Sequence, residues 1–88
     1  MTAIDSKTDK FDSIENLFGQ ILRKLRAEKG ISQEDLGFKS GYHRTYISLL
    51  ERGQKNPSLQ TIFRLAKALE ISPSELIRGI ESINGKSS

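Results

Sequence analysis

The side chains of this sequence that could do chemistry are mostly cationic, and they are concentrated in the middle of the chain. Residues 20–56 carry eight Lys or Arg and four Asp or Glu, a net charge of +4, whereas the whole 88-residue chain carries +3. The chemistry open to such a segment is ionic and hydrogen-bonded recognition of a polyanion. Because a solvated basic face is common on any protein, charge by itself is weak evidence for this function.

The sequence contains few residues that are suited to catalysis or to metal binding. The chain has no Cys, which excludes disulfides, Cys-based zinc sites and thiol catalysis, and its one His, His43, excludes His-pair metal sites. The acidic residues are scattered over the expected helix surfaces, so no catalytic constellation is visible. We therefore expect a protein that is not an enzyme and that needs no metal or cofactor.

The length and hydropathy of the chain limit its organisation. Eighty-eight residues leave room for one hydrophobic core, and no apolar run is long enough for a transmembrane span or a signal peptide. We expect a single cytoplasmic domain at residues 13–83, a mobile polar arm at residues 1–12 and a polar tail at residues 84–88. A separate sensor domain does not fit in this length, so no small-molecule effector is expected. Because no long apolar run is present, no membrane partner is expected either.

A spacing motif lies within the basic segment. Gln33, Gly37 and Gly41, followed by Ile47 and Leu50, have the spacing of a helix-turn-helix. Residue 37 lies where the two helices cross and must be small, and Gly41 permits the left-handed backbone of a sharp turn. Ile47 and Leu50 then form the inward face of the second of these helices. Its outward face carries Arg44, Thr45, Ser48 and Leu49.

Five helices and no strand are predicted, so the fold class is all-α, a compact five-helix bundle. Each helix has apolar residues at helical spacing and a start or stop signal such as Ser32, Gly41 or Ser58. The predicted helices cover about residues 14–29, 32–41, 44–51, 58–69 and 72–83. The residues expected in the core include Ile14, Leu17, Phe18, Ile21, Leu22 and Leu25 of the first helix, and Leu59, Ile62, Phe63, Ala66 and Leu69 of the fourth.

Four motifs resemble those of the Cro/repressor-like helix-turn-helix transcription regulators, the XRE family. They are Ile31–Leu36 (ISQEDL), Arg44–Ser48 (RTYIS), Glu51–Gly53 (ERG) and Asn56–Leu59 (NPSL). The resemblance covers roughly residues 17–80, and the second and third motifs look most like the controller proteins of restriction–modification systems. It implies a lambda-repressor-like bundle whose second and third helices form the helix-turn-helix. The implied function is a homodimer that binds near-palindromic operators in double-stranded DNA and regulates its own promoter.

A second role stays open for the same fold. The chain could be the antitoxin half of a toxin–antitoxin pair, which binds a partner toxin as well as DNA. The arm at residues 1–12 or the segment after Ile83 would have to hold the toxin. Neither segment carries enough apolar residues to favour this alternative.

The resemblance implies that the third helix enters the major groove of DNA with its N-terminal end first. Arg44 then takes the two acceptors of a guanine edge, and the other base-reading residues are Thr45, Ser48 and Leu49. The phosphate-binding residues it implies are Gln33, Tyr46, Arg52, Lys55, Asn56, Ser58 and His43. Three of the residues named for DNA contact have plainer alternatives: Arg44 as a solubilising residue, Tyr46 as a half-buried residue with a wet hydroxyl, and His43 as a surface residue or poor cap.

The resemblance also implies a structural salt bridge between Arg26 in the first helix and Glu51 at the end of the third. Such a pair would orient the recognition helix, because a buried ion pair is poor evidence of net stability. Glu51 would then not read DNA, despite lying next to the base-reading residues.

The fifth helix has more apolar residues than a terminal helix needs, which predicts a dimer surface. One short helix in one groove binds weakly, so regulators of this kind pair on half-sites about 34–36 Å apart. The expected interface, with help from the end of the fourth helix, consists of Leu76, Ile77, Ile80 and Ile83. The alternative is that Leu76 and Ile77 complete the core and only Ile80 and Ile83 are spare.

Overall fold

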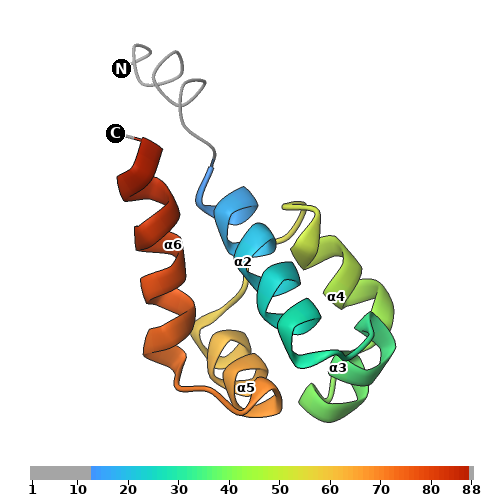
Figure 1. The fold of residues 1–88 in the computed structure, drawn as a ribbon. Coiled ribbons are helices and arrows are strands. Elements are labelled where there is room, and N and C mark those ends of the chain that lie inside the picture. Colours follow the sequence, from blue (N-terminus) through green and yellow to red (C-terminus); the bar gives the residue numbers. More distant parts are fainter. Residues whose placement is uncertain (1–12, 88) are drawn as a thin grey trace.

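The computed structural model describes residues 13–87, and in that range it contains five helices and no strand (Figure 1). They are α2 (Ile14–Lys29), α3 (Gln33–Ser40), α4 (Arg44–Glu51), α5 (Leu59–Leu69) and α6 (Pro73–Ser87). The predicted all-α bundle is therefore confirmed, whereas the expected arm at residues 1–12 lies outside the described residues. The backbone of α6 extends to Ser87, into the segment at residues 84–88 that was expected to be a polar tail.

Local caps determine where these helices begin and end. Ser13, Ser32 and Ser58 each accept a hydrogen bond from the backbone N–H three residues further on, which satisfies a free donor at the helix start. Ser32 and Asp35 form a complete capping box at the start of α3. Gly41 ends α3 with a φ of 83°, a left-handed conformation that glycine adopts without strain.

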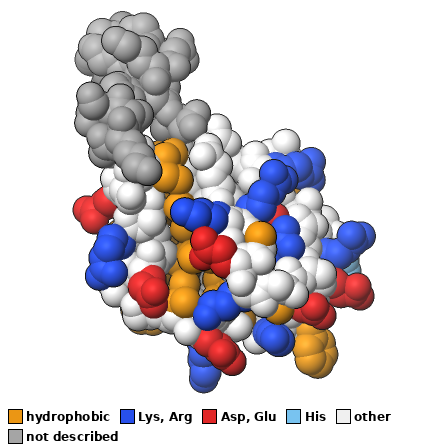
Figure 2. All heavy atoms as spheres, in the orientation of Figure 1, with side chains coloured by type: hydrophobic (Ala, Val, Ile, Leu, Met, Phe, Trp, Pro, Cys, Tyr) orange, Lys and Arg blue, Asp and Glu red, His pale blue; other side chains and the backbone are white. Residues whose placement is uncertain are grey.

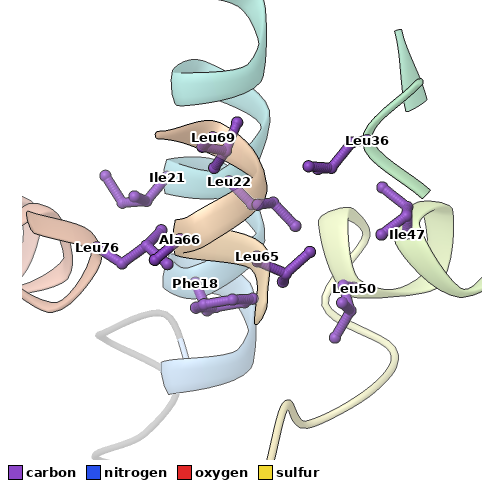
Figure 3. Close-up of a cluster of buried hydrophobic side chains, with 10 residues drawn as sticks. All are labelled: Phe18, Ile21, Leu22, Leu36, Ile47, Leu50, Leu65, Ala66, Leu69 and Leu76. Atoms are coloured by element: carbon purple, nitrogen blue, oxygen red, sulfur yellow. The ribbon is translucent and has the colours of Figure 1, made fainter. Parts of the chain in front are cut away.

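α2 lies at the centre of the bundle and packs against α4, α5 and α6, while α3 packs against α4 and α5 (Figure 1). Buried side chains from all five helices point into one cluster (Figure 3). The largest fully buried ones are Phe18, Leu22, Leu36, Ile47, Leu50, Leu65, Leu69 and Leu76. Each stabilises the fold by about 1.5–3 kcal/mol. Because α3 and α4 have only eight residues each, this core rather than their own hydrogen bonds keeps them helical.

Three residues expected in the core are exposed instead: Ile14, Leu59 and Phe63. Ile14 is the first residue of α2. In α5 the buried stripe is rotated from the predicted one and consists of Thr61, Leu65, Ala66 and Leu69. The physical reason is that the Thr61 hydroxyl finds hydrogen-bond partners inside the protein, so a polar residue occupies the inward face.

Two glycines allow backbones to approach closely. A Cβ at Gly19 in α2 would lie 2.5 Å from the carbonyl oxygen of Glu51, at the end of α4. A Cβ at Gly37 in α3 would lie 2.7 Å from the carbonyl oxygen of Tyr42, in the turn that follows. Since the neighbouring atoms belong to backbone, they cannot move aside without shifting a helix or the turn. Position 37 therefore needs a small residue, as the helix-turn-helix spacing predicted, because a larger side chain would collide with the backbone of the turn.

Candidate DNA-binding surface

The helix-turn-helix predicted from the sequence is formed by α3 and α4, which pack against each other. The backbone N–H of Tyr42 donates to the carbonyl oxygen of Gly37 at 2.8 Å, which closes α3 and begins the turn. The turn ends at His43, the N-cap of α4. His43, Arg44 and Thr45 are all exposed, so α4 leaves the turn with its N-terminal end open to solvent.

The four predicted base-reading residues all lie on α4. Arg44 and Thr45 are exposed in its first turn, and Ser48 and Leu49 are half-buried about one turn later. The opposite face of the helix is buried in the core. An exposed guanidinium has the paired donors that a guanine edge or a phosphate accepts. The geometry therefore permits the role predicted for Arg44 and makes Ser48 and Leu49 less accessible.

His43 is the cap of α4. Its Nδ1 accepts a hydrogen bond from the backbone N–H of Thr45 at 3.0 Å. This bond requires an unprotonated Nδ1, so a neutral ring carries its proton on Nε2. His43 is thus a helix cap rather than an ordinary surface residue. A contact from its Nε2–H to a phosphate stays a prediction.

Exposed polar and cationic residues continue from the end of α4 to the start of α5. Arg52, Lys55 and Asn56 are all exposed in this segment. Ser58 is exposed too, but its hydroxyl oxygen accepts the Thr61 backbone N–H and its hydroxyl proton goes to Thr61 Oγ1, both at 3.0 Å. A phosphate contact at this point would therefore use the backbone N–H groups at the start of α5 rather than the Ser58 hydroxyl.

Two residues predicted to contact phosphate, Gln33 and Tyr46, direct polar atoms toward other parts of the protein. Nε2 of Gln33 donates to Oε1 of Glu51 at 3.0 Å, which joins the start of α3 to the end of α4. Tyr46 is half-buried, and its hydroxyl lies 3.4 Å from Oγ1 of Thr61. Gln33 thus braces α4. Tyr46 fits the half-buried alternative, except that its hydroxyl has a protein partner.

Arg26 and Glu51 form the ion pair that the resemblance implied. Nε and Nη2 of Arg26 donate to Oε2 and Oε1 of Glu51 at 2.6 and 3.0 Å, and its Nη1 donates to the carbonyl oxygen of Ile31 at 2.9 Å. The Glu51 side chain is fully buried. Its hydrogen bonds raise the pKa of Arg26 above the ordinary value, although burial acts in the opposite direction. The pair joins α2 to the end of α4 and turns Glu51 toward the protein interior.

Charged side chains are unevenly spread over the surface. Figure 2 shows Lys and Arg side chains gathered on the side formed by α4, at the right of the view, with acidic side chains among them.

In residues 13–87 no group of three or more His, Cys, Asp or Glu residues could hold a metal ion. None of the helices in that range is long and apolar enough to cross a membrane.

A family model described as helix-turn-helix matches residues 22–76, more than half of the chain. The matched range contains all of α3, α4 and α5. The chain belongs to the helix-turn-helix family of transcription regulators. The resemblance noted in the sequence is therefore confirmed, as is the lambda-repressor-like fold class that it implied.

This helix-turn-helix regulator is similar to control proteins over most of its length. Control protein C.BamHI of Bacillus amyloliquefaciens is 46% identical over 67 residues, 75% of this chain and 83% of that protein. The restriction–modification controller C.AhdI from Aeromonas hydrophila is 55% identical, with a TM-score of 0.69 over 70% of this chain and 94% of its own. The clp gene regulator ClgR from Corynebacterium glutamicum gives a TM-score of 0.79 at 27% identity, over 83% and 78% of the two chains. These relatives do not favour the antitoxin alternative.

Three side chains near the turn of this helix-turn-helix regulator were missed in the sequence: Tyr42, Thr61 and Arg64. Tyr42 lies in the turn itself, and the other two lie on α5 and reach it. Tyr42 and Thr61 are 19 residues apart in the sequence, so no local spacing motif could connect them. The one available signal is a Thr within the apolar pattern of α5, at a position that an apolar stripe does not include.

The predicted dimer residues of the helix-turn-helix regulator separate in the structure. Leu76 is fully buried in the core of its own chain, so its prediction as an interface residue is wrong. Ile80 and Ile83 are half-buried against the same core, and only Ile77 is largely open, with 43% of its surface exposed. The reason is helical periodicity: Leu76, Ile80 and Ile83 share the face that packs on α2 and α5, and Ile77 lies off it.

Proposed function

We propose that this regulator is a restriction–modification controller that binds near-palindromic operator DNA as a homodimer and regulates its own promoter. The observation that carries the DNA-binding mode is the exposed N-terminal end of α4, from which Arg44 and Thr45 project. The other side of α4 is held by α2 and α3. The likeness to C.BamHI and C.AhdI over more than two thirds of each chain supports the controller role.

In this function the parts of the surface have different tasks. α4 enters the major groove, and Arg44 reads a guanine edge while Thr45, Ser48 and Leu49 face neighbouring base pairs. Arg52, Lys55, Asn56 and the start of α5 contact phosphates, which orients the protein on the duplex without reading sequence. The protein works in the cytoplasm with no small-molecule effector. Its own concentration is the signal, because dimerisation and DNA binding are coupled equilibria.

Selection of bound duplexes from a random DNA pool tests this function. We expect enrichment of a two-fold symmetric sequence with half-sites about 10 base pairs apart, and the same sequence upstream of the regulator's own coding region. Enrichment of an asymmetric sequence would contradict dimer binding. A pool that stays random after repeated rounds would contradict sequence-specific recognition altogether.

The proposed dimer surface lies at the junction of α5 and α6. Phe63 on α5 has 56% of its surface exposed, and it lines an apolar hollow together with Ile71 and Pro73. Pro73 and Ile77 are four residues apart, so they lie on one face of α6 next to this hollow. Exposed apolar residues that adjoin a hollow are the usual mark of a protein interface, and here the proposed partner is a second copy of the chain.

Replacing Phe63 with Glu is expected to give a monomer, because it puts a charge into the apolar contact between the two copies. Sedimentation equilibrium at tens of micromolar measures the change. Phe38→Glu is the matched control, since Phe38 is also an exposed Phe, at 88%, but lies on α3. The control is expected to remain a dimer. If both variants stay dimeric, or both become monomeric, the interface lies elsewhere.

A further inference from the structure

Tyr42, in the turn of the helix-turn-helix, is held from α5 at two points. Its hydroxyl lies 2.9 Å from Oγ1 of Thr61, which is almost completely buried. The guanidinium carbon of Arg64 lies 4.5 Å from the centre of the Tyr42 ring, a distance at which a cation is attracted by the ring face. Thr61 and Arg64 are three residues apart, so they lie on the same side of α5.

The same cluster extends to the recognition helix. The rings of Tyr42 and Tyr46 lie 4.9 Å apart and are tilted by 46°, an ordinary geometry for a packed aromatic pair. The Tyr46 hydroxyl is 3.4 Å from the same Thr61 oxygen. Thr61 accepts from the Ser58 hydroxyl, so it can accept from one tyrosine and donate to the other. One buried hydroxyl thus joins the start of α5, the turn and α4.

Arg64 also fixes the end of α3. Its Nε donates to the carbonyl oxygen of Ser40 at 3.0 Å, and its Nη2 lies 3.5 Å from the carbonyl oxygen of Gly41. Carbonyl groups at a helix C-terminus lack partners within the helix and carry partial negative charge, so a cation there is stabilising. Arg64 therefore contacts both the backbone and the aromatic side chain of the turn.

We propose that Thr61 and Arg64 are positioning residues for DNA recognition, and that Tyr42 is the side chain through which they act. Together they fix the angle at which α4 presents Arg44 and Thr45. The need for such a brace follows from the length of α4, whose eight residues cannot hold a conformation alone. A recognition helix that is loosened by about 1 Å loses productive contacts even when all of its contacting residues remain. The inference rests on the proposed DNA-reading role of α4.

Removal of the shared hydrogen bond tests the brace. Thr61→Val and Tyr42→Phe each delete one hydroxyl, and affinity is measured for the duplex selected by the wild-type regulator and for a scrambled duplex. We expect Tyr42→Phe to bind the selected duplex roughly 3- to 10-fold more weakly, as the loss of one buried hydrogen bond predicts. Thr61→Val should bind at least as weakly, because it also removes the contacts to Ser58 and Tyr46. The double variant should bind the selected duplex about as weakly as Thr61→Val alone, because Thr61→Val already removes the hydrogen bond that Tyr42→Phe deletes. Thr61→Ser keeps the hydroxyl and should bind like the wild type.

Affinity is measured well below the melting temperature of every variant, so that loss of stability alone cannot lower the folded fraction. Binding to the scrambled duplex should be unchanged, since phosphate contacts do not need a fixed helix angle. Strictly additive effects of the two hydroxyl deletions, or failure of Thr61→Ser to restore binding, would overturn the inference.

Arg64→Gln tests the second contact, with Arg78→Gln as its matched control. Arg78 is an exposed cation on α6, so both variants lose one positive charge. We expect Arg64→Gln to lower the affinity for the selected duplex several-fold more than Arg78→Gln does. The two variants should bind the scrambled duplex with equal affinity. Equal effects on the selected duplex would mean that Arg64 acts only through its charge, and the brace would be wrong.

Hydrogen exchange in the free protein separates this inference from the proposed function. Thr61→Val should speed the exchange of the Tyr46 and Ile47 amides, which donate to the His43 carbonyl at the start of α4. Unchanged exchange would overturn the brace, even if DNA binding is normal. Faster exchange in a protein that binds no DNA sequence selectively would support the brace and contradict the DNA-reading function.

Discussion

Replacing Arg26 with Ala is expected to destabilise the protein by about 3–5 kcal/mol, because it leaves a fully buried carboxylate without its cation. In the wild type both oxygens of Glu51 accept hydrogen bonds from Arg26. In the variant Gln33 still donates one hydrogen bond to this carboxylate, but its amide is neutral and does not replace the lost positive charge. Since small domains have only about 5–15 kcal/mol of stability, this loss should be plain in urea or thermal unfolding.

Arg23→Ala is the matched control for this prediction. Arg23 reaches the same carboxylate, but at 3.8 Å and with 66% of its side chain exposed, so its loss should cost no more than about 0.5 kcal/mol. Replacing Arg26 and Glu51 together with Met and Leu should recover most of the stability, because no buried charge is then left unpaired. If Arg26→Ala unfolds no more easily than Arg23→Ala, the ion pair does not have the structural role described.

Arg44→Ala is expected to weaken binding to the selected operator by a large factor without changing stability. A bidentate contact to a guanine contributes about 1–3 kcal/mol of discrimination, and a dimer has two copies of it. Repeating the selection with the variant should show relaxed preference at one base pair of each half-site. Because Arg44 is exposed at the first position of α4, its unfolding curve should match that of the wild type.

Lys55→Ala distinguishes base reading from phosphate binding. Lys55 is an exposed cation in the segment between α4 and α5. Its loss should weaken selected and scrambled duplexes in equal proportion and lower the salt dependence of binding by about one unit per subunit. Fluorescence anisotropy over a range of salt concentrations measures both effects. If both variants change the ratio of the affinities for selected and scrambled DNA by the same factor, the division of roles between Arg44 and Lys55 is wrong.

Most of the fold was predictable because its signals are local. The Ser32 and Ser58 caps and the left-handed Gly41 act within three or four residues, and the structure places helix ends close to them. The spacing from Gln33 to Leu50 predicted the helix-turn-helix for the same reason. The four motifs between Ile31 and Leu59 were enough to identify the family, and the structure exposes Arg44 and Thr45 at the start of the second motif.

The rest of the candidate site depends on contacts between distant parts of the chain. The sequence could not tell that α5 turns Thr61 inward and Phe63 outward, because both orientations satisfy a helical pattern. Nor could it tell that Leu76 enters the core, since that depends on how α6 lies across α2 and α5. A helical period limits which residues share a face, but the neighbours determine which face is buried.

The sequence by itself therefore determined the class of this protein, its helices and which residues α4 exposes in its first turn. Beyond the Arg26–Glu51 pair that the resemblance implied, the tertiary structure alone decided how α4 is held: by Gln33 at its end, through Glu51, and by α5 at its start, through Tyr42. The physical reason is range. Caps and helical periods arise from neighbours along the chain, whereas ion pairs and buried hydroxyl contacts join residues about 20 apart, which only the folded core brings together.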